Sequence, residues 1–266
     1  MSSPEPQPKR HYWRWLVLAI ILSFTWCGWR VWDEKQAGKE ARALGWEWEV
    51  DEPIEVIRKD WKAAFRKATW LHGQRWMMVP SAEDYDEHRD LVRRLRPRQV
   101  AVFNASKWHD LSALNGLSGL RSLQLEGCKG LTNLDALKRQ TELQSLWLGG
   151  CKRLANVDAL TGLSELRALS LEGCPSLTNV DALKGLSSLE SLTLFGCAGL
   201  TNVDALNGLS RLQSLELIGC TGLTNVDGLN GLSSLQSLCL KRSRALSRER
   251  KRALSVALPN TKIEGP

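Results

Sequence analysis

Leucines recur along the C-terminal two thirds of this chain with a period of 23 residues. The strings LEGCKGLTNLDAL, LGGCKRLANVDAL, LEGCPSLTNVDAL, LFGCAGLTNVDAL and LIGCTGLTNVDGL begin at Leu125 and at every 23rd residue up to Leu217. Within each unit an L-x-L string alternates apolar and polar positions, which is typical of a strand with one buried side. The apolar residues that follow come at steps of three, which suits 3₁₀ turns. The pattern therefore predicts one short strand and one 3₁₀ turn per unit.

The same phase continues beyond these five units. A strand column runs from Leu123 to Leu238, with Val100 placed 23 residues before it and Thr261 placed 23 residues after it. This makes eight units, of which the first and last are degenerate, as capping units are. Since no unit can bury its own leucines, we expect the strands to stack into a parallel sheet at about 4.8 Å per strand.

The pattern L-x-x-L-x-L-x-x-C, as in Leu143, Leu146, Leu148 and Cys151, followed by LxxVxxLxxL, resembles the leucine-rich repeat. The short spacing is most similar to the bacterial internalin-type class, lengthened by one residue. The resemblance covers residues 95–266. It implies an α/β fold, a leucine-rich repeat solenoid or horseshoe, with a parallel sheet on the concave face and short 3₁₀ turns on the convex face. It also implies a protein ligand on the concave face.

Five cysteines form a further column with the same period. A catalytic or metal site needs different groups that converge, whereas this column repeats one group along a stack. The resemblance implies that these thiols are structural, buried under the turn with the S–H directed toward backbone carbonyls. Disulfides between adjacent turns are not excluded by the spacing. The column consists of Cys128, Cys151, Cys174, Cys197 and Cys220.

Two polar ladders, which begin at Asn133 and Asp135, repeat in the next four units. Five aspartates at about 5 Å spacing repel one another. Capping of the following turn would offset this repulsion, because Asp is a favoured N-cap residue. A calcium ladder would need more carboxylates per turn, so we expect the aspartates to cap turns and we expect no metal site.

An uncharged stretch, WLVLAIILSFTWCGW, occupies residues 15–29. Fifteen helical residues span about 22 Å, less than the roughly 30 Å of a bilayer core. Arg14 and Arg30, which can snorkel, and tryptophans at both ends supply the remaining length. We predict an uncleaved transmembrane anchor over residues 13–32. A cleaved signal peptide is an alternative that Trp26 disfavours, since cleavage requires small residues there; a buried soluble helix is the other alternative.

The anchor divides the chain into an N-terminal tail (1–12), a small helical collar (33–94) and the repeat domain (95–266), whose C-terminal cap begins at about residue 241. Basic residues flank the anchor on both sides and do not decide its orientation. Three cations, Lys9, Arg10 and Arg14, precede the uncharged stretch and are costly to translocate. We therefore expect a single-pass membrane protein with its C-terminal domain outside the cytoplasm. A row of free thiols favours a reducing compartment and weighs against this orientation.

The collar contains one predicted strand, Arg75 to Val79, and one predicted helix that Ser81 opens. Within that helix Asp84 and His88 share a face, which admits a metal interpretation. The helix dipole offers a simpler explanation, because acidic residues precede basic ones along the helix. We therefore favour the dipole explanation.

Outward positions beside the strand leucines vary freely between units, whereas the position before each strand is nearly always serine. Positions with a structural role would stay constant, so we assign partner binding to the variable ones; drift of solvated positions is the alternative. These positions lie on the side of the sheet that points away from the core, which the resemblance implies is the concave face. We call this surface the outer sheet face. Large apolar groups near one another there indicate an interaction site. The predicted partner-binding residues are Gln124, Glu126, Trp147, Glu172, Thr193, Phe195, Glu216 and Ile218.

No catalytic constellation, phosphate loop or CxxC motif is present, so we expect neither an enzyme nor a cofactor. An enzyme housed in residues 33–99 would be too small to favour.

The C-terminal run KRSRALSRERKR holds seven basic residues and one acidic residue. A solvated cap explains it, and the alternative function is a cytoplasm-facing module whose basic cap binds anionic lipid or nucleic acid. Nucleic acid is the less favoured partner, because the central repeats carry no basic excess.

Overall fold

The computed structural model describes residues 47–49, 76–79 and 81–265. The predicted tail at 1–12 and the predicted anchor at 13–32 lie outside the described residues. Within the described ranges, no helix is both long and apolar enough to cross a membrane. The described residues therefore cover the repeat domain and the part of the collar next to it.

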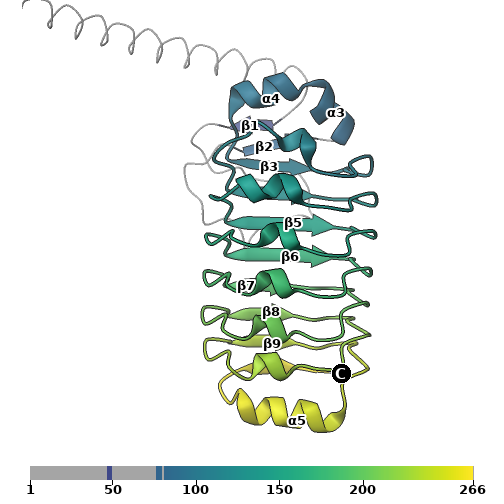
Figure 1. The fold of residues 1–266 in the computed structure, drawn as a ribbon, viewed down its shortest axis with the longest axis vertical. Helices are drawn as coiled ribbons and strands as arrows, with labels where there is room; N and C mark the ends of the chain where they lie inside the picture. Colours follow the sequence, from purple (N-terminus) through teal and green to yellow (C-terminus); the bar gives the residue numbers. More distant parts are fainter. Residues whose placement is uncertain (1–46, 50–75, 80, 266) are drawn as a thin grey trace, which may run out of the picture.

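A ten-stranded sheet runs along the long axis of the described part of the chain, with its strands in sequence order (Figure 1). The first strand pairs antiparallel with the second, and all later neighbours pair in parallel. The strands are β1 (Glu47–Glu49), β2 (Trp76–Val79), β3 (Gln99–Val102), β4 (Ser122–Leu125), β5 (Ser145–Gly149), β6 (Ala168–Glu172), β7 (Ser191–Thr193), β8 (Ser214–Glu216), β9 (Ser237–Cys239) and β10 (Lys262–Glu264).

The register confirms the 23-residue period from β3 to β9. Val100 lies opposite Leu123, and the same step joins Leu146 to Leu169. The last unit differs from the prediction, because Ile263, and not Thr261, lies opposite Leu238. This unit is two residues longer because the α-helix α5 (Arg248–Ala257) replaces the 3₁₀ turn. The predicted strand in the collar is confirmed as β2, and it joins the sheet in parallel with β3.

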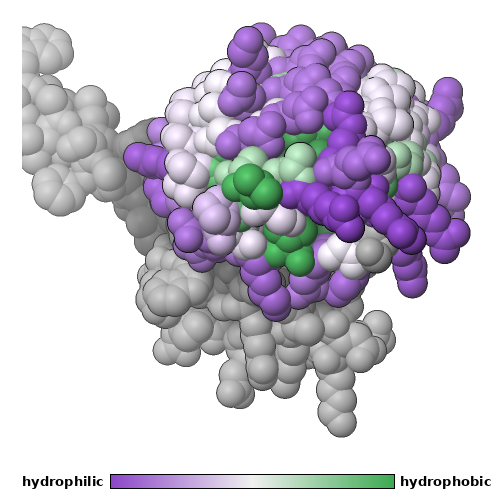
Figure 2. Space-filling model, turned by 90° about the horizontal axis from the view of Figure 1, so that it is seen from below, coloured by the Kyte–Doolittle hydropathy of each residue, from purple (hydrophilic) through white to green (hydrophobic). Residues whose placement is uncertain are grey.

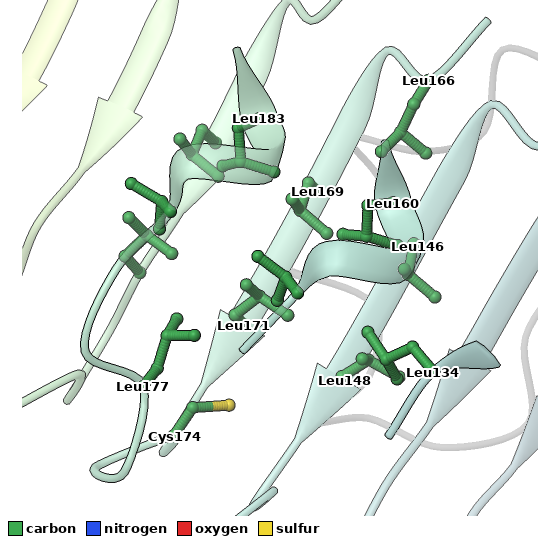
Figure 3. Close-up of a cluster of buried hydrophobic side chains, with 14 of the residues drawn as sticks. Leu134, Leu146, Leu148, Leu160, Leu166, Leu169, Leu171, Cys174, Leu177 and Leu183 are labelled. Atoms are coloured by element: carbon green, nitrogen blue, oxygen red, sulfur yellow. The ribbon is translucent and has the colours of Figure 1, made fainter. Parts of the chain in front are cut away.

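The core is a stack of leucine layers between the sheet and the opposite side of the solenoid. Leu146, Leu148, Leu160 and Leu166 are all at most 1% exposed. Figure 3 shows such leucines pointing from the strands and from the opposing turns into one interior. Truncation of one of them to alanine typically costs about 2–5 kcal/mol, so each layer contributes substantially to stability.

The predicted 3₁₀ turns are present on the side opposite the sheet (Figure 1). Their capping differs from the prediction: the aspartates make no side-chain cap, and the asparagine two residues earlier accepts a hydrogen bond from the aspartate N–H instead. An Asx turn of this kind is the usual local hydrogen bond of Asn. The turns are η1 (Ser112–Leu114), η2 (Asp135–Arg139), η3 (Asp158–Leu160), η4 (Asp181–Leu183), η5 (Asp204–Leu206) and η6 (Asp227–Leu229).

The cysteine column is buried, with every member at most 1% exposed and none in a disulfide. The thiols of Cys197 and Cys220 lie 3.3 and 3.0 Å from the carbonyl oxygens of Leu171 and Leu194, as the resemblance implied. Burial raises the pKa of the Cys220 thiol to about 11, which keeps it protonated at neutral pH. Ser243 continues the column and donates to the carbonyl oxygen of Leu217 in the same way.

Because Ser243 already places a buried hydroxyl in this column, Cys197→Ser is expected to be well tolerated. The hydroxyl can use the Leu171 carbonyl that the thiol now contacts, so no buried polar group is left without a partner. We expect the free energy of unfolding to fall by less than about 1 kcal/mol in urea denaturation. A loss above about 2 kcal/mol would contradict an equivalent role for the two positions.

Two short helices, α3 (Ala82–Glu87) and α4 (Arg89–Leu95), cover the N-terminal end of the repeats (Figure 1). Ser81 caps α3 as predicted, since its side chain accepts from the Asp84 N–H. Tyr85 packs edge-on against Trp108, with 5.2 Å between ring centroids. The His88 ring nitrogen lies 3.0 Å from the Asp84 backbone oxygen, so this contact involves the main chain of Asp84 and not its carboxylate.

The last 3₁₀ turn contains Gly228, whereas the preceding turn has Ala205 at this position. A Cβ at Gly228 would lie 2.5 Å from the Asp204 Cα and 2.5 Å from the Val203 carbonyl oxygen. Both are backbone atoms, so the two turns would have to separate. The Asn225 amide also donates to the Asp204 carboxylate at 3.2 Å, which holds the turns together.

We therefore expect Gly228→Ala to lower the free energy of unfolding by about 1–3 kcal/mol, the usual cost of overpacking. The better helix propensity of alanine, at most about 1 kcal/mol, opposes this loss and is the smaller effect. Thermal and urea denaturation of the variant would measure the difference. A stabilised variant would show that the close approach of the last two turns is not maintained.

Candidate functional site

The outer sheet face consists of two adjacent columns of side chains. Strand alternation places the residue between the two leucines and the residue after them on the side opposite the core. The register aligns Gln124, Trp147 and Ser170 in the first column, and it aligns Gly149 with Glu172 in the second. The sequence-predicted binding residues therefore belong to one continuous surface.

Exposure differs along this surface. Phe195 is the most exposed of its large apolar residues, at 42%, and Glu172 is also exposed. The other predicted binding residues are half-buried: Gln124, Glu126, Trp147, Thr193, Glu216 and Ile218. Three variable outward positions are buried instead, namely Ala101, Ser170 and Cys239. Larger neighbours in register account for Ser170, which lies between Trp147 and Thr193.

The apolar residues form two groups on this surface. Phe195 and Ile218 follow strands β7 and β8 and lie on neighbouring turns, joined by a 2.8 Å hydrogen bond from the Gly196 N–H to the Ile218 carbonyl. Trp147 belongs to β5, so strand β6 separates it from the turn of Phe195. Two strand spacings are about 10 Å, a distance that one contiguous protein epitope easily covers.

Two carboxylates lie on either side of Gly149. Gln124 donates a 3.3 Å hydrogen bond to Glu126, and Ser170 donates a 3.4 Å hydrogen bond to Glu172. Between them Gly149 carries no side chain, and a Cβ there would lie 3.9 Å from the Glu126 Cγ. Burial, together with the charge of Glu172, raises the pKa of Glu126. A cationic group placed over Gly149 would therefore relieve an existing repulsion.

The C-terminal end of the sheet carries two lysines that share one carboxylate. The Lys241 and Lys262 ammonium groups lie 2.7 and 3.0 Å from the Glu264 carboxylate. Their hydrogen bonds hold the pKa of Glu264 down at about 2. Sequence reasoning missed this cluster, although the alternation of Lys262, Ile263 and Glu264 signals an edge strand whose charges discourage further pairing.

Comparison with known protein families concerns the repeat units. Residues 110–247 match the family model described as the BspA-type leucine-rich repeat region, in six copies. This chain belongs to the BspA-type leucine-rich repeat family. The leucine-rich repeat predicted from the sequence is thereby confirmed. No curated protein matches the sequence.

A solved leucine-rich repeat domain shares the fold at low sequence identity, and two further solved structures match part of this chain. The leucine-rich repeat domain of the type III effector XopL has a TM-score of 0.53 and 19% identity, over 90% of this chain and 89% of that one. A leucine-rich repeat protein of Leptospira interrogans has a TM-score of 0.44 and 18% identity, over 65% of this chain and 50% of that one. Internalin C2 of Listeria monocytogenes has a TM-score of 0.38 and 25% identity, over 57% and 72%. This BspA-type chain thus spans half the length of the Leptospira protein.

Proposed function

We propose that this protein is a non-enzymatic, membrane-anchored leucine-rich repeat protein that binds a protein partner on its outer sheet face. The observation that carries the proposal is the set of large apolar side chains on that face. Phe195 is 42% exposed and lies next to the turn that carries Ile218, while Trp147 lies two strands away. Exposed apolar groups gathered in this way are typical of protein-binding surfaces.

The carboxylates define the chemistry of the partner. Glu126 and Glu172 flank Gly149, which has no side chain. Trp147 lies two residues before Gly149 on the same strand, β5. Lysine or arginine side chains suit such a site, since carboxylates pair with cations and tryptophan faces attract them. The proposed partner therefore presents an apolar patch together with at least one cationic side chain.

Site-specific photo-crosslinking tests the assignment of the face. A photoreactive phenylalanine at Thr193 is expected to crosslink to the partner in cells, and the same group at Lys184, at the end of turn η4, is expected not to. The crosslinked protein, once identified, can be purified and titrated against the wild-type chain. Crosslinking of both positions to the same protein with equal yield would contradict the proposed face.

The proposed location is a single-pass membrane anchor at residues 13–32, with the repeat domain outside the cytoplasm. Its support is the uncharged stretch at 15–29 between flanking tryptophans and arginines. Reporters fused to the C-terminus, one active only outside and the other only inside the cytoplasm, test the orientation. Activity of the inside reporter alone would reverse it.

A further inference from the structure

The C-terminal cap, residues 241–257 with helix α5, presents cations that have no ion-pair partner among the described residues. Two cations of this segment are paired: Lys241 with Glu264 and Arg250 with Asp227. Arg250 also donates to the Asn225 side chain at 2.7 Å, which fastens the helix to the last repeat. The remaining cations, for which the described residues hold no ion pair, are Arg242, Arg244, Arg248, Lys251 and Arg252.

One side of α5 combines charge with an exposed apolar group. Leu254 is buried against the core, so the opposite side of the helix faces solvent. Arg248, Arg252 and Val256 are four residues apart and form one strip along that side. Val256 is 81% exposed. Figure 2 views this end of the molecule and shows small hydrophobic areas surrounded by hydrophilic residues. We call Arg248, Arg252 and Val256 the cap strip.

We propose that the cap strip binds the surface of a bilayer rich in anionic headgroups. Charge complementarity supports it, because the five cations without ion pairs face only Glu249 as an acidic residue within the run. The exposed Val256 favours a bilayer over nucleic acid as the partner. An aliphatic side chain can enter the headgroup region of a bilayer but gains nothing from a phosphate backbone. The contact is peripheral and electrostatic, distinct from both the outer sheet face and the predicted anchor.

The geometry of the solenoid gives this contact a consequence. The helices α3 and α4 cover one end of the stack and α5 covers the other (Figure 1). Ten strands at about 4.8 Å place the two ends about 45 Å apart. A chain anchored near its N-terminus and attached through α5 would thus hold its repeats along a bilayer or bridge two bilayers.

Vesicle flotation of the full-length chain tests the proposal. The background variant is Leu18→Arg with Ile21→Arg, which removes the predicted anchor, and pure phosphatidylcholine vesicles measure any residual insertion. We expect at least about a hundredfold stronger partitioning into phosphatidylcholine vesicles that contain about one third phosphatidylglycerol, because each of several cations contributes about 1 kcal/mol. High salt should abolish the difference, because it screens charges beyond a few ångströms.

Matched variants locate the contact. Each cation near an anionic surface contributes a factor of about five, so Arg248→Gln with Arg252→Gln should weaken partitioning about thirtyfold. The control, Arg153→Gln with Lys184→Gln, changes the net charge equally and should stay within about twofold of the background. Val256→Ser should weaken partitioning by about threefold, since it removes apolar area from the contact.

Three results would overturn the proposal. The first is equal binding to neutral and anionic vesicles, and the second is equal loss in the two double variants. The third is displacement of the chain from anionic vesicles by a short DNA duplex, with DNA binding that depends on Arg248 and Arg252. That result would assign the cap strip to nucleic acid. None of these results bears on crosslinking at the outer sheet face.

Discussion

The double variant Leu18→Arg with Ile21→Arg is expected to move the full-length chain from the membrane fraction to the soluble fraction. Both positions lie within the uncharged stretch at 15–29. An arginine near the centre of a membrane helix costs about 2.5–3.5 kcal/mol of insertion, so the pair costs about 5–7 kcal/mol. Fractionation with a high-salt, alkaline wash measures the effect, because this wash removes peripheral proteins.

The control for this variant is Leu18→Val with Ile21→Val, which keeps the segment apolar and should remain in the pellet. Circular dichroism of the released arginine variant should match that of a folded repeat domain, because both substitutions precede the repeat units in the sequence. Arginine variants that stay in the pellet after the alkaline wash would contradict an anchor in this segment.

The second large effect is expected at Trp147. Trp147→Ala should weaken binding of the crosslinked partner at least about thirtyfold, because tryptophan is the residue most enriched at binding hot spots, where truncation costs about 2 kcal/mol or more. Titration of the purified partner measures the loss. The side chain is half-buried and its strand neighbours Leu146 and Leu148 hold the core, so the fold should persist.

Lys184→Ala provides the matched control, since Lys184 is exposed and lies at the end of turn η4, on the side of the solenoid opposite the sheet. It should change neither binding nor stability. If Trp147→Ala unfolds the domain, the indole has a structural role. If both variants bind the partner equally well, partner binding does not depend on this residue and the hot-spot assignment is wrong.

The repeat fold could be predicted from the sequence because its strands and their register both follow from one 23-residue period. Alternation of Leu146 and Leu148 with polar residues defines the strand, and identical spacing in the next unit defines the register. The cysteine column has the same period, and the resemblance to the leucine-rich repeat implied its burial. Ser243 could also have been assigned to that column, since it lies 23 residues after Cys220.

Contacts that cross between unlike segments could not be predicted in this way. Asn and Asp recur with one period, so their spacing does not show which side chain caps the turn; the structure assigns this role to Asn. The ion pairs of Glu264 and Arg250 depend on how the cap folds back onto the last repeat, a segment outside the period. The longer last unit also shifted the register of β10.

The uniform register from β3 to β9 makes the length of this protein adjustable in whole turns. Removal of residues 174–196 would join Gly173 to Cys197. Cys197 would then occupy the position that Cys174 now occupies after Gly173, because the two cysteines are one period apart. Strand β6 would then pair with β8 through the same leucine columns. Ser170 would lie beside Glu216, so a new recognition surface would arise without any new backbone conformation. Gain or loss of one repeat is thus a simple route by which such a chain can change what it recognises.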